Sequence, residues 1–115
     1  MARILKLHSH ASAEASAVLF AALGDRQRLW LVSRLCDGGP RSITQLASGA
    51  RISRQAVTKH LRVMEHAGLV RSARRGRERV WQLEQRRLEE ARRYLSEISA
   101  QWDAVLERLR VFVEE

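Results

Sequence analysis

The stretch "SRQAVTKHLRVMEHAGLVRSARRGRER", residues 53–79, begins with the residue spacing of a short amphipathic helix. Val57, Leu61 and Met64 recur at intervals of four and three, so they fall on one face of a helix. Ser53 directly precedes the helix and is a favourable N-cap, because its hydroxyl can accept a hydrogen bond from a free backbone amide. The stretch therefore predicts a helix that buries one apolar stripe and leaves its polar face open.

The second half of the same stretch is strongly basic. Five arginines stand within the nine residues 71–79. Gly68 occupies the position at which a left-handed residue commonly ends a helix. The segments on either side of Gly76 have the composition of two short strands. We predict a β-hairpin that turns at Gly76 and carries arginines at its tip.

The rest of the chain is predicted to be helical, because it contains helix-forming runs and the whole sequence has one Pro and six Gly. Asp25 and Ser42 are predicted N-caps. The predicted helices cover residues 12–23, 25–35, 42–49, 53–67 and 85–113. Two short helices joined by a tight turn, with a basic hairpin after the second, describe a winged helix-turn-helix. The expected fold class is mainly α with a small β-hairpin wing, in a dimeric protein.

We expect one domain in three parts. Residues 1–11 form a flexible N-terminal arm, residues 12–83 form the winged helix-turn-helix, and residues 84–115 form a long dimerisation helix of the same domain. At 115 residues the chain can build a modest core, which a partner subunit would extend.

Positive charge is concentrated in the middle of the chain. Residues 1–40 carry a net +2 (five Lys and Arg, three Asp and Glu) and residues 41–83 a net +8 (ten and two). Residues 84–115 carry a net −2 (six and eight), so the middle segment alone equals the total of +8. A concentrated charge of this size indicates a polyanionic partner such as nucleic acid.

The polar face of the predicted helix carries side chains that can recognise DNA. Glutamine can pair with adenine, arginine with guanine, and threonine can offer its methyl or hydroxyl group. A solvated face with no ligand is the ordinary alternative, and the arginines that follow favour DNA. The residues concerned are Arg54, Gln55, Thr58, Lys59 and Arg62 on the helix, with Arg74, Arg75 and Arg77 at the hairpin tip.

From Ala22 to Leu83, the segments "ALGDRQRLWLVSRL" and "ITQLASGARISRQAVTKHLRVMEHAGLVRSARRGRERVWQL" resemble the ArsR-type family of bacterial winged-helix transcriptional repressors. The resemblance implies a homodimer on an imperfect inverted repeat of double-stranded DNA, with the recognition helix in the major groove and the wing alongside. The DNA-facing residues that it implies are Ser53, Arg54, Gln55, Thr58, Lys59 and His60, together with the wing arginines Arg74, Arg75, Arg77 and Arg79.

The predicted last helix carries an apolar seam with intervals of three and four residues. The seam consists of Leu88, Ala91, Leu95, Ile98, Trp102, Val105, Leu109 and Phe112. Such spacing is typical of paired helices, and about 29 helical residues would reach roughly 43 Å, more than a small domain needs. The alternative is a seam that packs only on its own domain. We expect a dimer interface, which the resemblance extends to the first helix, here through Leu19.

Metal sensing, the best-known activity of the resembling family, is not expected here. The arsenic sensors of that family carry Cys-x-Cys in the third helix, where this chain reads "ITQLAS". Zinc-sensing members use His and acidic ligands on the last helix, and the predicted last helix has no His. His8 and His10 are a weak chelating pair, and Cys36 is expected to be a small buried residue. We expect no metal and no cofactor.

Other classes of function are less well supported. Two alternatives remain open: a winged helix whose arginines meet an acidic protein partner, and RNA binding, which the shortage of aromatic residues in the hairpin disfavours. Trp81 and Trp102 are expected to pack in apolar interiors rather than to line a ligand pocket. No arrangement typical of an enzyme is present.

No segment approaches the ~20 apolar residues of a membrane span. A single cysteine and no recognisable secretion signal indicate a cytoplasmic protein. No residue pattern identifies an effector.

Overall fold

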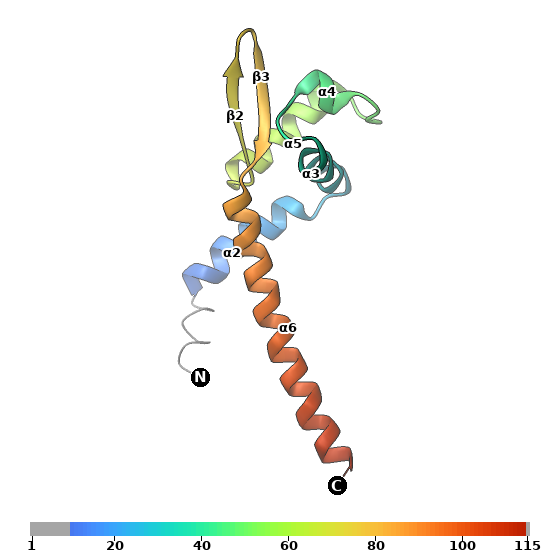
Figure 1. Ribbon diagram of the computed structural model, residues 1–115, viewed down its shortest axis with the longest axis vertical. Coiled ribbons are helices and arrows are strands. Elements are labelled where there is room, and N and C mark those ends of the chain that lie inside the picture. Colours follow the sequence, from blue (N-terminus) through green and yellow to red (C-terminus); the bar gives the residue numbers. More distant parts are fainter. Residues whose placement is uncertain (1–9, 115) are drawn as a thin grey trace.

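The computed structural model describes residues 10–114 of the chain. In chain order its elements are α2 (His10–Leu23), α3 (Arg26–Gly38), β1 (Arg41–Ser42), α4 (Ile43–Ala47), α5 (Arg54–His66), β2 (Val70–Arg75), β3 (Glu78–Leu83) and α6 (Gln85–Glu114). Helices α2 to α5 and the sheet form a small domain, from which α6 extends as a stalk (Figure 1). The predicted fold class, mainly α with a small β wing, is confirmed.

The helices begin at the N-caps predicted from the sequence. The Asp25 carboxylate accepts hydrogen bonds from the amides of Gln27 and Arg28 at 2.9 and 3.1 Å. At α4, the Ser42 hydroxyl and the Gln45 side chain each bond the other residue's backbone amide, which is a capping box. These bonds satisfy amides that the helix itself leaves free.

The wing is the predicted hairpin of β2 and β3. A third strand, β1, which we did not predict, extends it to a three-stranded sheet. Strands β2 and β3 pair antiparallel from Val70 with Leu83 to Arg75 with Glu78. The turn needs Gly76, whose φ of 61° lies in the left-handed region. The two-residue strand β1 pairs with the other edge of β3, and a strand of that length has no periodicity that a sequence could reveal.

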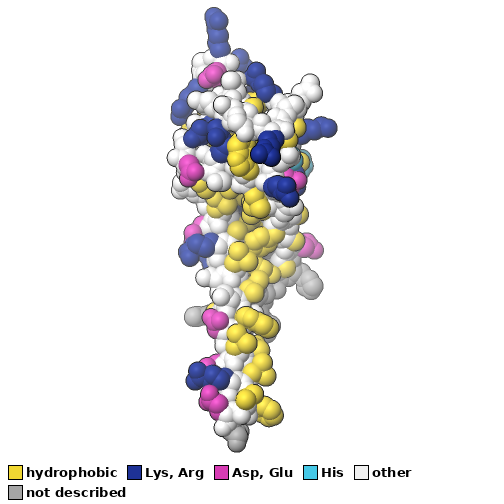
Figure 2. Space-filling model, turned by 90° about the vertical axis from the view of Figure 1, so that its right-hand side faces the viewer, with side chains coloured by type: hydrophobic (Ala, Val, Ile, Leu, Met, Phe, Trp, Pro, Cys, Tyr) yellow, Lys and Arg dark blue, Asp and Glu magenta, His cyan; other side chains and the backbone are white. Residues whose placement is uncertain are grey.

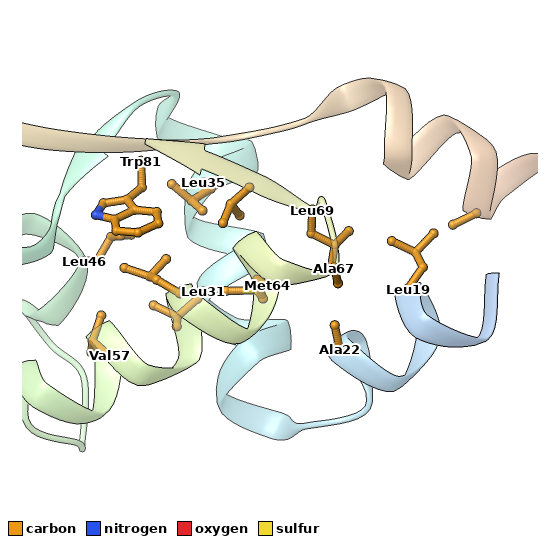
Figure 3. Close-up of a cluster of buried hydrophobic side chains, with 13 residues drawn as sticks. Leu19, Ala22, Leu31, Leu35, Leu46, Val57, Met64, Ala67, Leu69 and Trp81 are labelled. Atoms are coloured by element: carbon orange, nitrogen blue, oxygen red, sulfur yellow. The ribbon is translucent and has the colours of Figure 1, made fainter. Parts of the chain in front are cut away.

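The core lies where α3, α4 and α5 meet the inner face of the wing (Figure 3). Its fully buried side chains include Leu31 of α3, Leu46 of α4, Val57 of α5 and Trp81 of β3. The predicted interior position of Trp81 is confirmed. Trp102 is 62% exposed on the stalk, so the described chain alone does not supply the interior in which we predict it to pack.

Helix α6 belongs to the domain only at its N-terminal end. Its Ala91 is buried, and the Tyr94 ring lies 6.0 Å from the Phe20 ring of α2. Beyond this contact α6 leaves the domain, which explains the elongated extents of 66 × 27 × 20 Å. None of the described helices is both long enough and apolar enough to span a bilayer.

The N-terminus of α2 differs slightly from the prediction. The helix begins at His10, whereas the predicted arm ran to residue 11 and the predicted helix began at residue 12. The remainder of the predicted arm, including His8, lies outside the described residues.

Replacement of Leu31 by alanine tests the placement of the core. Leu31→Ala is expected to lower the free energy of unfolding by about 2–5 kcal/mol, because it leaves a cavity at a fully buried position. Leu29→Ala is the matched control on the same helix, since Leu29 is 52% exposed, and it should cost about 0.5 kcal/mol or less. Urea denaturation at one protein concentration measures both. Equal losses would contradict this core.

Candidate nucleic-acid interface

Helix α5, the predicted recognition helix, has two faces of opposite character. Val57, Leu61 and Met64 are fully buried and form the apolar face. The other face is open to solvent. Of the residues predicted to contact DNA from this helix, Ser53, Arg54, Gln55, Lys59 and Arg62 are exposed, whereas Thr58 and His60 are partly buried.

Hydrogen bonds fix the first turn of α5. The Ser53 hydroxyl accepts from the amide of Ala56 at 3.1 Å. The Arg54 guanidinium donates to the hydroxyl of Thr44 on α4 at 2.8 Å. This second bond ties the two helices of the helix-turn-helix together at the end that is expected to enter a DNA groove.

The middle of the polar face is less constrained. The Thr58 hydroxyl donates to the backbone oxygen of Arg54 at 2.9 Å, which engages its only hydroxyl proton and leaves the oxygen able to accept. Gln55 and Lys59 make no hydrogen bond or ion pair with any other residue that the structure describes. Their polar groups are therefore free for a ligand.

His60 does not share this open face. Its Nε2 lies 2.9 Å from the side-chain oxygen of Gln27, and its Nδ1 lies 3.2 Å from a guanidinium nitrogen of Arg28. Both partners belong to the first turn of α3. The structure thus corrects the expectation that His60 faces DNA, because its ring is turned toward the neighbouring helix and held there from both sides.

The His60 contacts fix one tautomer of the neutral ring. A guanidinium can only donate, so Nδ1 must accept from Arg28. The proton must then be on Nε2, which donates to the Gln27 oxygen. Arg28 is itself anchored, since its Nε donates to the backbone oxygen of Ala22 at 2.5 Å. We call the contacts of His60 with Gln27 and Arg28 the α3–α5 bridge.

Asp25 lies beside the α3–α5 bridge. Its carboxylate is 4.0 Å from Nδ1 of His60. The hydrogen bond from the Arg28 amide holds the pKa of the Asp25 carboxyl below its usual value, and the Gln27 amide and the nearby positive charges act in the same direction. A charged carboxylate at this position caps α3 and faces the same residues that hold His60.

Arg62 has intramolecular partners as well. Its guanidinium lies 5.5 Å from the centre of the Trp81 ring and 3.1 Å from a carboxylate oxygen of Glu65. The side chain is nevertheless 60% exposed. Arg62 therefore places its guanidinium over the core tryptophan and still leaves that charge accessible to solvent.

The wing separates arginines that have partners from arginines that do not. Arg79 donates to the Ser72 hydroxyl across the hairpin at 2.8 Å. Arg74, Arg75 and Arg77 are exposed at or near the turn, and none of their side chains makes a hydrogen bond or ion pair with another described residue. Three unpaired cations at one tip create a local positive field that attracts anions.

Most of the basic side chains and the exposed apolar band lie in different parts of the molecule. In Figure 2, many Lys and Arg side chains gather at the domain end, whereas a band of apolar side chains runs down the stalk. The basic end contains α5 and the wing, so it brings together the residues predicted to contact DNA, apart from His60.

Comparison with known proteins supports the same interpretation. A family model described as a helix-turn-helix domain matches residues 23–73. The uncharacterized HTH-type transcriptional regulator YuzN of Bacillus subtilis is 38% identical over 68 residues, which cover 54% of this chain and 74% of the relative. The HTH-type transcriptional regulator Rv2034 of Mycobacterium tuberculosis is 41% identical over 63 residues, with 55% and 58% covered.

A solved structure extends the similarity over most of the chain. An ArsR-like transcriptional regulator from Rhodococcus sp. RHA1 superposes with a TM-score of 0.76 at 33% identity, covering 89% of this chain and 95% of that one. The chain belongs to the ArsR-type family of winged helix-turn-helix regulators. It is therefore an HTH-type transcriptional regulator, and the family of DNA-binding proteins named from the sequence is confirmed.

Several contacts of this ArsR-type regulator were missed in the sequence analysis. Asp25 was recognised as an N-cap, but nothing in the sequence places Gln27 or Arg28 against His60. The Thr44–Arg54 bond was missed for the same reason. These residues are 10 to 33 positions apart in the chain, so their proximity depends on how the helices pack. The position of His60 between Lys59 and Leu61 does not reveal whether its ring contacts a neighbouring helix or DNA.

Among the described side chains, the remaining candidate ligands do not converge. Cys36 is exposed at the end of α3, so the expectation of a buried residue is wrong. Within the described part of the chain, no group of three or more His, Cys, Asp or Glu side chains is placed to hold a metal ion. His66 is exposed in the last turn of α5.

The α3–α5 bridge predicts the protonation pattern of His60. In the neutral ring, Nε2 should carry the proton and Nδ1 should be an acceptor, because Arg28 can only donate. Long-range proton–nitrogen correlation spectra distinguish the two tautomers, and exposed His66 gives an internal comparison. A neutral ring protonated on Nδ1 would show that Arg28 does not hold His60 in this way.

Proposed function

We propose that this regulator is a repressor that binds an inverted repeat as a homodimer, with α5 in the major groove and the wing on the sugar–phosphate backbone. The observation that carries the proposal is the juxtaposition of a free polar helix face, at Gln55 and Lys59, with the unpaired arginines of the wing tip. Winged helices use these two parts to read bases and to hold phosphates.

Sequence reading is assigned to the outer face of α5. Gln55 has a free amide that matches the donor and acceptor of adenine in the major groove. Thr58 presents a methyl group suited to thymine once its hydroxyl proton is engaged by the backbone. Arg54 is held to Thr44, so it can reach a base or phosphate with little loss of side-chain entropy. We do not include His60 among the base-reading residues, because its ring is bonded to Gln27 and Arg28 of α3.

Affinity is assigned mainly to the wing. Arg74, Arg75 and Arg77 are exposed and unpaired among the described residues, so phosphate contacts would cost them no existing ion pair. Each neutralised phosphate releases counterions, which makes such contacts independent of base sequence and sensitive to salt. Arg79 is hydrogen-bonded to Ser72, so its guanidinium is less free to extend toward a phosphate. Arg62 lies beside the wing, over Trp81.

The stalk supports the proposed dimer. Five predicted seam residues on α6 are 42–77% exposed in the described chain: Leu95, Ile98, Trp102, Leu109 and Phe112. Leu106 and Val113, also exposed, widen the apolar band. A soluble monomer rarely exposes such a continuous patch. A second stalk would bury it and add core that a chain of this size lacks.

The domain end of the predicted seam is already occupied. Leu19 and Ala91 are 1% and 6% exposed, because α2 and α6 pack on each other within one chain. They cannot also form an outer surface, so we remove them from the proposed interface. Leu88 and Val105 are partly buried and lie at its margins. The division into a DNA-binding part, residues 12–83, and a dimerisation helix, residues 84–115, remains a proposal on the same grounds.

We propose repression because a dimer seated on an operator excludes other proteins by occupancy alone. We also propose that the regulator does not use the metal sites of its relatives. The α4 helix reads "ITQLA" and α6 has neither Cys nor His in its described length, so neither element offers a thiolate or imidazole ligand. Its place of action would be the cytoplasm, where bacterial DNA lies.

Selection from random duplex DNA at about 150 mM salt tests the proposed function, since that salt weakens plain charge attraction. We expect an inverted repeat whose half-sites are about one helical turn apart. Binding without a common sequence, lost as salt rises, would contradict a sequence-specific regulator.

Two single variants separate the proposed roles within the interface. Gln55→Ala should lose about 1–3 kcal/mol on the selected operator and little on a scrambled duplex, because a base contact disappears. Arg74→Ala should weaken both duplexes equally and reduce the slope of log affinity against log salt by about one. Fluorescence anisotropy over a salt series gives these values. Equal behaviour of the two variants would refute the division of roles.

The proposed stalk interface predicts that Trp102→Glu dissociates the dimer. A buried charge in place of an indole, present twice in a two-fold interface, should raise the dimer Kd on the order of a hundredfold or more. Ala104→Glu adds the same charge at an exposed position on the other side of the stalk and should leave the Kd near its original value. Sedimentation equilibrium measures both. A Trp102→Glu protein that stays dimeric would exclude this interface.

A further inference from the structure

A hollow of about 340 Å³ lies between the first turns of α3 and the turn that joins α4 to α5. Arg26, Gln27 and Trp30 of α3 form one wall, and Arg51 and Ile52 of the turn form another. The hollow is separate from the polar face of α5 and from the wing. Nothing in the proposed reading of DNA requires it.

The residues around the hollow select a particular kind of ligand. Arg26 and Arg51 are exposed, and neither bonds or pairs with another described residue. Two guanidiniums from two different elements fit a carboxylate, whose oxygens can accept from both. Trp30 and Ile52 supply apolar surface between them. A flat apolar body that carries one carboxylate matches both properties of the site.

A phosphate of the DNA backbone fits the same hollow less well. A phosphate presented by a duplex is attached to sugars on both sides and meets the surface of a protein rather than an enclosed apolar wall. The wing already offers three unpaired arginines at an exposed tip for such contacts. The side chains of Trp30 and Ile52 can pack against the apolar body of a small molecule, whereas a phosphate has no apolar surface to pack against them.

The hollow is connected to the recognition helix through one side chain. Gln27 lines it, and the Gln27 oxygen accepts the hydrogen bond from Nε2 of His60 on α5. A ligand that draws the Gln27 amide toward its carboxylate takes this acceptor away from His60. The α3–α5 bridge then loses one of its two bonds, and α5 is less firmly held in its position against α3.

We propose that this hollow binds a small aromatic carboxylate and that occupancy weakens DNA binding through the α3–α5 bridge. The regulatory half rests on the proposed DNA-binding function, whereas the binding half does not. Loss of one hydrogen bond in the bound state should lower operator affinity by about fivefold. By linkage, operator DNA should lower the affinity for the carboxylate by the same factor.

Binding is tested on the full chain without DNA. Benzoate is the probe, with benzyl alcohol as a ring without charge and acetate as a charge without a ring. In proton–nitrogen NMR titrations, benzoate should shift the Trp30 indole signal, and both controls should bind more weakly. Arg51→Ala should weaken benzoate binding about tenfold or more, whereas Arg93→Ala, an exposed change on α6, should not.

The outcomes of the binding test are distinct. Benzoate shifts centred on Trp30 and lost in Arg51→Ala support the site. Equal binding of acetate would overturn the aromatic preference. Benzoate shifts located elsewhere, or unaffected by Arg51→Ala, would overturn the site itself. If Arg51→Ala fails to fold, Arg26→Ala provides the same comparison from the opposite wall.

Regulation is tested by operator affinity with and without saturating benzoate. The expected fivefold weakening should disappear in His60→Phe, which removes the bridge but leaves the residues of the hollow in place. His60→Asn serves if the phenylalanine variant does not fold.

Weakening that persists in both variants would mean that benzoate competes directly with DNA, and the bridge mechanism would be wrong. Benzoate binding with no change in operator affinity would overturn regulation alone. Absence of any operator would refute the proposed function and leave the binding result intact.

Discussion

The burial of Trp81 is the contact on which the arrangement of the domain depends. Its indole is fully buried where β3 meets α3, α4 and α5, and it lies among Leu31, Leu46 and Val57 in Figure 3. The same residue pairs with Arg41 of β1 across the sheet. One side chain therefore fixes the sheet against the helix-turn-helix. Because Arg62 lies over the ring, the contact also joins the core to the basic surface.

This arrangement divides the cationic side chains by how freely they move. Arg54 and Arg79 are each held by a hydroxyl group of another element or strand, and Arg62 is held over Trp81. The three arginines at the wing tip have no such restraint from the described residues. Restrained groups suit contacts that depend on geometry, whereas mobile cations suit a phosphate chain whose position varies along the duplex. The arginines of the interface thus fall into a restrained group, Arg54, Arg62 and Arg79, and an unrestrained group at the wing tip.

The sequence predicts what depends on local chemistry. Asp25, Ser42 and Ser53 were identified as caps because N-capping needs only a short polar side chain at the right place. The seam of α6 was visible because its period repeats over 30 residues. The three caps and the long helix that carries the seam are confirmed. The DNA contacts and the dimer interface assigned to them remain predictions.

What the sequence did not predict depends on packing between elements. His60 and Gln27 are 33 residues apart, and no local pattern reveals that the ring of one meets the amide of the other. The strand β1 is too short to have a period. Cys36 was expected inside because cysteine is usually buried. Its exposure follows from its place at the end of α3, outside the core.

The junction between β3 and α6 has a mechanical consequence. A single residue, Glu84, separates the last strand of the wing from the stalk, and its amide donates to the backbone oxygen of Leu69 at 2.8 Å. Such a short and bonded junction transmits rotation rather than absorbing it. A rod of 30 residues is about 45 Å long, and a tilt of about ten degrees displaces its far end by about 8 Å. In the proposed dimer, the stalks would act as coupled levers, and the angle at which they cross would set the distance between the two wings.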